Sequence, residues 1–358
     1  AELSMFDGTI TEYRTIFSSE DYSGGWFNVV VDCNLFTTLT LANVEQWGFR
    51  MQYHTSAKNI DNCWIDYIRY LDGYSMTGGS ASPDDPITLA SIAAADVADP
   101  ANSPEVDTGY GILTAFSGAY FCTGDMQFGT GATTTYVKLD GDILIFEDKP
   151  VASGLYSLSG VGTGTTVTIQ NSYITSAGVS DDTRYVFDWS DTNLASFTCT
   201  ANSIVRAGAC TFKSGQTVTG NIFDNCGQIT HGGATLNNSI VKNYVSTASP
   251  VDSALVYNVN ADPDGEMDGM TFEKGDATAH AIEFGLLSPT TMTLTDVTVT
   301  GYNATDSQPD STFHFKRTSG TVTLNLVGFS GNYSYLSDGA TINIVADPVT
   351  VKATATTT

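Results

Sequence analysis

The stretch LNNSIVKN, residues 236–243, holds an apolar residue, a pair of asparagines and an apolar pair flanked by polar residues. Similar stretches are VTGNIFDN (218–225), LTDVTVTG (294–301) and LNLVGFSG (324–331). Elsewhere, short runs of Val, Ile, Thr, Phe and Tyr alternate with Gly, Asn, Asp and Ser, which is typical of many short strands. A phrase that recurs in this way indicates a repeat architecture.

Two positions show a constant residue type, and so form two columns, when the sixth residue of each eight-residue phrase, an apolar one, is taken as an anchor. The anchors are Leu35, Ile65, Phe121, Leu144, Ile174, Val205, Phe223, Val241, Phe272, Val299 and Phe329. Five residues before an anchor the residue is apolar in ten of eleven cases, and three residues before it the residue is Asn, Asp or Gly in ten of eleven. Because Gly, Asn and Asp enter the left-handed backbone region most easily, the second column predicts a tight corner between two strands.

Successive anchors are spaced as the coils of a solenoid would be, since most lie 18 to 31 residues apart. The sequence therefore predicts an all-β fold, a single-stranded right-handed parallel β-helix with irregular coil lengths. Asn62, Asn171, Asn202 and Asn238 are expected at left-handed or bridge positions of a structural corner ladder. Their anchors should be buried.

Three segments are expected along the chain. Residues 1–26 form an amino-terminal cap or attachment segment, residues 27–345 the β-helix, and residues 346–358 a strand-like tail. The largest gap between anchors contains a predicted insertion, about residues 70–111, with a short helix around residues 89–97. An alternating pattern in residues 347–358 predicts one strand that pairs with a neighbouring chain, in a trimer or a larger symmetric array.

Composition limits the classes of partner. Asp and Glu outnumber Lys and Arg 39 to 14, which gives a formal charge of −25, while only 15% of residues are charged. Such a chain repels nucleic acid and anionic lipid. Because no run of about 18 apolar residues occurs, we expect no membrane insertion.

The six cysteines, Cys33, Cys63, Cys122, Cys199, Cys210 and Cys226, form no CxxC pair. We expect them to be free and mostly buried, with no disulfide bonds. Cys33 and Cys63 precede their anchors by two residues, so they would stack if their coils are adjacent.

The corner column resembles the right-handed parallel β-helix of pectate-lyase-like proteins and phage tailspikes, over about residues 27–345. Phage virion proteins of this kind are similar in composition too, being acidic and rich in Thr, Ser, Gly and Asn. The resemblance implies a virion structural protein, and some tailspikes degrade polysaccharides with carboxylates and a basic residue.

Candidate chemistry is sparse. The catalytic candidates are Asp181, Asp182 and Arg184. The pair Asp181 and Asp182 resembles the adjacent aspartates of polygalacturonases, but that family's Gly-His-Gly and Arg-x-Lys are missing. In GVSDDTRY, aspartates most simply form a turn. A calcium loop is the functional interpretation of ADPDGEMDG, whose carboxylates are Asp262, Asp264, Glu266 and Asp268. EF-hand spacing is not met, so a solvated loop is the simpler account. His280 and Glu283 alternate along a strand, which favours a satisfied surface or corner histidine over a general base.

The expected function is a non-enzymatic structural protein of a bacteriophage virion, either a capsid decoration or a tail fibre or spike component at the particle surface. Its partners would be copies of itself and other virion proteins, with host-surface glycan as a further candidate. We expect no cofactor. The alternatives are a polysaccharide lyase or hydrolase and a cell-surface adhesin.

Overall fold

A computed structural model describes residues 2–6, 11–15, 46–50, 82–98, 112–123, 125–129, 134–146, 156–177, 184–245 and 253–347. The chain divides into two compact units, Ala1–Tyr70 and Leu71–Thr358. In the first unit, β1 (Glu2–Phe6) pairs antiparallel with both β2 (Thr11–Thr15) and β3 (Gln46–Arg50). Thus β3, which falls in the stretch assigned to the β-helix by sequence, belongs to a separate antiparallel sheet.

In the second unit, the strands that the structure describes form four stacked sheets, named I to IV here. Sheet I contains β7 (Thr135–Asp140), β10 (Thr165–Gln170), β13 (Ser196–Thr200) and β16 (Thr217–Thr219). Sheet II contains β4 (Ile112–Phe116), β5 (Ala119–Thr123), β8 (Ile143–Phe146), β11 (Tyr173–Ser176), β14 (Ser203–Val205), β17 (Ile222–Asp224), β19 (Ile240–Lys242), β21 (Thr271–Glu273) and β24 (Thr298–Thr300).

Sheet III contains β6 (Met126–Phe128), β9 (Tyr156–Gly160), β12 (Tyr185–Asp188), β15 (Ala207–Thr211), β18 (Ile229–Thr230), β20 (Ser253–Tyr257), β22 (His280–Phe284), β25 (Phe313–Phe315) and β27 (Tyr335–Ser337). Sheet IV contains β23 (Thr291–Thr295), β26 (Thr321–Val327) and β28 (Thr341–Ala346). Within these four sheets every described strand pair is parallel except β4 with β5.

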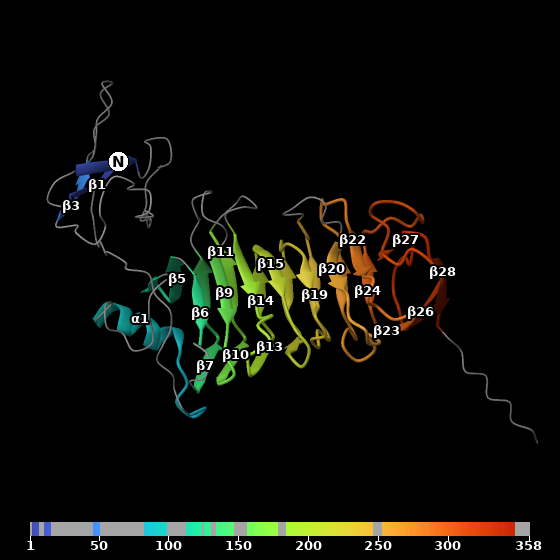
Figure 1. Cartoon of the computed structure of the whole chain (residues 1–358), viewed down its shortest axis with the longest axis horizontal. Helices are drawn as coiled ribbons and strands as arrows, with labels where there is room; N and C mark the ends of the chain where they lie inside the picture. Colours follow the sequence, from blue (N-terminus) through green and yellow to red (C-terminus); the bar gives the residue numbers. More distant parts are fainter. Residues whose placement is uncertain are drawn as a thin grey trace, which may run out of the picture. The chain divides into compact units, whose positions relative to one another are not determined.

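The chain visits sheets I, II and III in turn, as in a parallel β-solenoid: β7, β8 and β9 are followed by β10, β11 and β12, then by β13, β14 and β15. Sheet IV takes the place of sheet I in the last coils. Figure 1 shows these coils side by side, in green through red. The prediction of an all-β fold of parallel strands is confirmed.

The core lies between the sheets because the strands alternate buried and half-exposed residues, with a period of two. One coil contributes Leu139, Leu144 and Leu158, all with no exposed surface. The next contributes Ile169 and Ile174 at the same register. Each sheet thus supplies one wall of a continuous apolar interior.

The corner between sheets I and II carries the predicted left-handed column. Asn171 has φ 53° and Asn238 φ 58°, with Ile174 and Val241 buried as expected. Gly141, Gly220, Gly269 and Asp296 occupy equivalent corners with φ from 56° to 76°. Asn62 lies outside the described residues.

One coil is displaced by one residue from the predicted register. Ala201, not Asn202, has the positive φ (57°), and Ile204, not Val205, is the buried anchor that pairs with Ile174. The physical reason is that Asn202 turns inward and becomes fully hydrogen bonded there, so the corner moves back to Ala201.

Because a left-handed conformation costs an L-residue roughly 1–2 kcal/mol, replacing Ala201 by glycine should stabilise the fold by about 1 kcal/mol. Chemical denaturation measures this gain. The matched control is Ala209→Gly inside β15, where glycine should instead destabilise by about 0.5–1 kcal/mol. Equal effects at the two positions would contradict the corner assignment.

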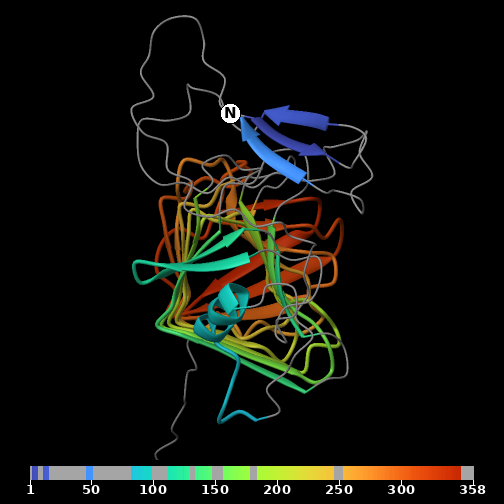
Figure 2. The same ribbon diagram turned by 90° about the vertical axis from the view of Figure 1, so that its left-hand side faces the viewer.

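The predicted insertion contains the helix α1 (Leu89–Ala98), as expected. Thr88 caps it by accepting the Ser91 N–H at 3.1 Å through Oγ1, and Leu89 and Ile92 are buried. The preceding Ile87 forms a parallel bridge to Val137 of β7. Figure 2 shows α1 across the β6–β7 end of the coil stack, where it covers the apolar interior.

The cysteines agree with the prediction where the structure describes them. Cys122, Cys199, Cys210 and Cys226 are thiols outside any disulfide bond, and all four are buried. Burial raises the pKa of the Cys199 thiol to about 12, which makes it an inert core residue. Cys33 and Cys63 lie outside the described residues. In the described part of the chain, no helix combines the length and apolar character needed to cross a membrane.

Candidate functional site

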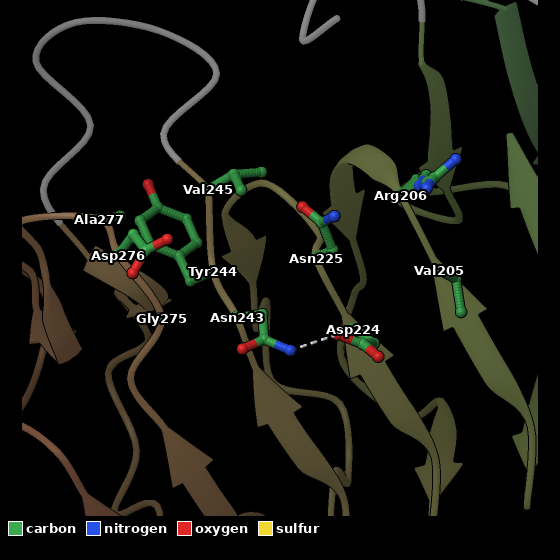
Figure 3. A pocket seen from close by; sticks show the side chains of 10 residues that line it. All are labelled: Val205, Arg206, Asp224, Asn225, Asn243, Tyr244, Val245, Gly275, Asp276 and Ala277. Carbon is green, nitrogen blue, oxygen red and sulfur yellow. Dashed lines mark hydrogen bonds between the residues drawn. The ribbon is translucent and has the colours of Figure 1, made fainter. Parts of the chain in front are cut away.

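An open depression of about 390 Å³ crosses four consecutive coils at the corner between sheets II and III (Figure 3). Residues 205–206, 224–225, 243–245 and 275–277 line it. Arg206, Asn225 and Asn243 form a second left-handed column here, with φ of 56°, 56° and 52°. Gly275 is required because a Cβ there would meet the Cα of Asn243 at 2.8 Å.

Asp224, Asn225 and Asn243 in this depression are held by hydrogen bonds or ion pairs to neighbouring residues. Asn243 donates through Nδ2 to Asp224 Oδ1 at 2.8 Å, and Lys242 lies 3.3 Å from Asp224 Oδ2. Arg184, one of the candidate catalytic residues, is 4% exposed and donates through Nη1 to the Asn225 carbonyl at 2.8 Å. Arg184 therefore supports the corner from inside, while Asp181 and Asp182 lie outside the described residues.

The calcium candidates point to separate partners. These candidates are Asp262, Asp264, Glu266 and Asp268. Asp262 accepts the Thr293 N–H at 2.7 Å, Asp264 accepts the Thr295 hydroxyl at 3.0 Å, and Asp268 accepts a backbone N–H within the loop at 3.0 Å. Across the described ranges, no three His, Cys, Asp or Glu side chains are grouped to hold a metal ion. The loop is thus tied to sheet IV by hydrogen bonds.

A carboxylate–histidine cluster on the outside of sheet III was not identified from sequence. Glu283 of β22 pairs in register with His314 of β25, and Asp338 follows β27. His314 Nε2 lies 3.0 Å from Asp338 Oδ1, and His314 Nδ1 lies 3.7 Å from Glu283 Oε2. Lys316 Nζ is also 3.7 Å from Glu283 Oε2.

Burial within this cluster is graded. The His314 side chain is 3% exposed and that of Glu283 13%, whereas the Lys316 and Asp338 side chains are 34% and 40% exposed. A buried imidazole between two carboxylates, with a cation at the surface, is a set of groups able to hold and move a proton. The only signals in the sequence were the HFKR run and HAIEF, and parallel register was needed to bring them together.

His280, expected at a surface or corner, is instead fully buried. Its Nδ1 lies 2.6 Å from the Ser311 carbonyl oxygen, so Nδ1 carries the proton and donates it. The imidazole rings of His280 and His314 lie 4.8 Å apart. His280 therefore helps to pack the inner side of the cluster.

His231 is a third buried histidine, and it gives a pH prediction. Its Nδ1 accepts the Gly233 N–H at 3.0 Å, so the proton sits on Nε2, and burial lowers the histidine pKa to about 4. The ring packs edge-on against Tyr257, at 4.9 Å between centroids. The folded state thus favours neutral imidazole.

The unfolded chain protonates His231 near pH 6.5, whereas the folded chain protonates it only near pH 4. The contribution of neutral His231 to the free energy of unfolding is therefore fully present above pH 6.5. It should fall by about 3 kcal/mol as pH drops from 6.5 to 4. Urea unfolding across this window measures the slope. His231→Gln, which keeps an acceptor for the Gly233 N–H, should flatten it; an unchanged slope would rule His231 out as the source.

Comparison with known proteins adds no relative: no protein family, curated protein or solved structure matches the chain at a significant level.

Proposed function

We propose that this protein is a non-enzymatic structural component of a bacteriophage virion, a capsid decoration or a tail fibre or spike component. It would present a right-handed, single-stranded parallel β-helix at the particle surface. Its partners would be copies of itself and other virion proteins, and its charge of −25 disfavours nucleic acid.

The observation that carries the proposal is the structural use of the polar side chains. Arg184, Asp224, Asp262 and Asp264 each hold a corner or a loop of the coil stack. The depression in Figure 3 is open, and two of its lining residues, Asn243 and Asp224, are hydrogen bonded to each other. Such a stack suits a rigid display scaffold.

Outward positions on sheet I support the same function. From β10 to β16 they carry threonine, serine and glutamine: Thr166, Thr168, Gln170, Ser196, Thr198, Thr200, Thr217 and Thr219. The threonines among them are stiff β-branched residues, which suit a pleated, half-exposed surface without adding charge.

Quantitative mass spectrometry of gradient-purified particles from the culture that produces this chain tests the proposal. We expect a fixed copy number relative to the major capsid protein, in a multiple that fits a symmetric site on the head or tail. Recovery of the chain only in the particle-free fraction would contradict a virion role.

A polysaccharide lyase or hydrolase is the second candidate, because the carboxylate–histidine cluster offers an acid, a base and a cation in one place. Under the structural proposal, the purified protein should release no reducing ends or unsaturated products from acidic or neutral polysaccharides. Release that His314→Gln abolishes, while Thr168→Ala on sheet I retains it, would replace the structural proposal with an enzymatic one.

The proposed pairing of residues 347–358 with a neighbouring chain remains a prediction, because only Asp347 of this segment lies within the described residues. Deleting residues 347–358 should weaken assembly and leave the coil stack folded, as judged by circular dichroism and sedimentation. A truncated chain that assembles like the full one would exclude the tail as an assembly strand.

A further inference from the structure

We propose that the outer face of sheet II, over β5, β8, β11 and β14, is the surface on which one copy of this chain contacts another. The inference deepens the proposed assembly of copies and rests on it. It assigns the contact to a part of the fold that the sequence did not single out. The strands concerned lie next to one another in the order β14-β11-β8-β5.

This outer face is apolar. Ile145 pairs with Phe121 on one side and Thr175 on the other, and Ile143 pairs with Tyr173. Ile143 and Tyr173 are 40% and 42% exposed, among the most exposed large hydrophobic side chains of the described residues. We call Phe121, Ile143, Ile145, Tyr173 and Val205 the apolar face.

The inward residues of the same strands are packed in the core. The strands therefore cannot rotate to bury the apolar face instead. Leu144, Ile174 and Ile204, which alternate with the outward residues, have no exposed surface. Parallel sheets in proteins are usually covered on both sides, because their strands bury apolar residues on each. Sheet II is covered by the core on one side, and its exposed apolar residues on the other side would gain from a second cover.

Charge identifies the second cover as another copy. The segments AYFCT, ILIF, YITS and SIV, which form β5, β8, β11 and β14, contain no Asp, Glu, Lys, Arg or His. A basic partner would be attracted to the acidic parts of a chain with charge −25, and this face offers it nothing. Two copies, in contrast, repel each other wherever carboxylates face carboxylates, so they can approach closely only on an uncharged face.

The boundaries of the apolar face agree with this assignment. Beyond β14, the outward positions of β17 and β19 hold Ile222 and Ile240 together with the Asp224–Lys242 ion pair, and Asp142 lies at the corner just before β8. An apolar centre with charges at its edge is the usual anatomy of a protein interface. The outer face of sheet I is also uncharged from β10 to β16, but its threonine hydroxyls can remain hydrated, so it has less to gain from being covered.

The test compares the full chain with Tyr173→Lys by sedimentation velocity over a range of concentrations. The control is Thr168→Lys, an outward half-exposed position of the same coil on sheet I. We expect the unmodified chain and the control to associate reversibly. Tyr173→Lys should raise the dissociation constant at least about tenfold, because an ammonium group would be buried without a partner. A second variant, Ile143→Glu, should do the same.

Thermal unfolding of each variant separates loss of association from loss of fold, since both positions point away from the core. A monomeric unmodified chain at high concentration, or association of Tyr173→Lys equal to that of the control, would overturn the inference. Association that depends on Tyr173 in a chain absent from virions would leave the interface standing and refute the virion role. If the chain is incorporated into particles and Tyr173→Lys leaves that incorporation unchanged, the virion role would stand and the proposed interface would be refuted.

Discussion

Asn221→Ala should lower the free energy of unfolding by about 4 kcal/mol, because it leaves several buried polar groups without partners. Asn221 has no exposed surface. Its Oδ1 accepts both the backbone N–H and the Nδ2 group of Asn202 at 3.0 Å, and its Nδ2 donates to the Cys199 carbonyl at 2.8 Å. Urea or guanidinium unfolding measures the change.

The same arrangement continues along the corner, which is why one substitution acts on several coils. The Ser172 N–H donates to Asn202 Oδ1 at 2.8 Å, and the Asn221 N–H donates to Ser239 Oγ at 3.2 Å. The buried side chains of Asn202, Asn221 and Ser239 thus each accept a hydrogen bond from the corner backbone N–H of the preceding coil. Asn193→Ala, at an exposed position in the loop before β13, is the control and should change stability by less than about 0.5 kcal/mol.

If Asn221→Ala unfolds within about 1 kcal/mol of the unmodified chain, the buried amide does not link the coils in the way described. A loss confined to the coils that contact Asn221, seen as local hydrogen exchange, would still agree with it, because solenoid stability is carried by neighbouring coils.

Trp189→Ala should cost a similar amount, about 4 kcal/mol, through the cavity that it leaves. Trp189 is fully buried and stacks on Phe197, with 4.0 Å between ring centroids and 9° between planes. Phe187 meets the same indole edge-on at 5.4 Å, and Phe128 lies 6.4 Å from it. Two consecutive coils lose their shared aromatic contact when the indole is removed.

Trp189→Phe is the informative control. It keeps a ring against Phe197, and it removes an indole Nε1 that is buried without a hydrogen-bond partner among the described residues. We expect a loss below about 1.5 kcal/mol. Calorimetry on both variants measures the loss of stability. If Trp189→Phe loses as much stability as Trp189→Ala, the shape of the indole, rather than ring stacking, stabilises this part of the core.

The corner column was predictable because the conformation that it demands is local. A left-handed conformation favours Gly, Asn or Asp at its own position, so the corners at Asn171, Gly220, Asn238 and Asp296 could be predicted directly from the sequence. The short helix α1 was predictable for the same reason. The alternation of strands between buried and half-exposed residues also follows from local spacing.

Features that depend on the register between coils could not be predicted from the sequence. Ala201 gives no turn signal, and only the inward hydrogen bonds of Asn202 place the corner there. The corner amide Asn221 likewise looks like a loop residue until its partners on adjacent coils are known. For the carboxylate–histidine cluster, Glu283 and His314 are 31 residues apart and meet only because β22 and β25 are neighbours.

The apolar face of sheet II illustrates the same limit. Ile143 and Tyr173 were each adjacent to a correctly predicted anchor, yet a single strand does not reveal that its outward residue lies beside another outward hydrophobic residue. The face follows from stacking several strands in register, which is a property of the assembled parallel sheets.

The most direct test of the coil architecture is an experimental structure of the full chain, read at the corner between sheets I and II. The quantity to measure is the backbone φ angle at residues 141, 171, 201, 220, 238, 269 and 296. We expect a positive φ at all seven, each followed within a few residues by a buried side chain that faces its counterpart in the next coil. Ordinary β angles at most of these positions, inside uninterrupted strands, would contradict the solenoid and the functions argued from it.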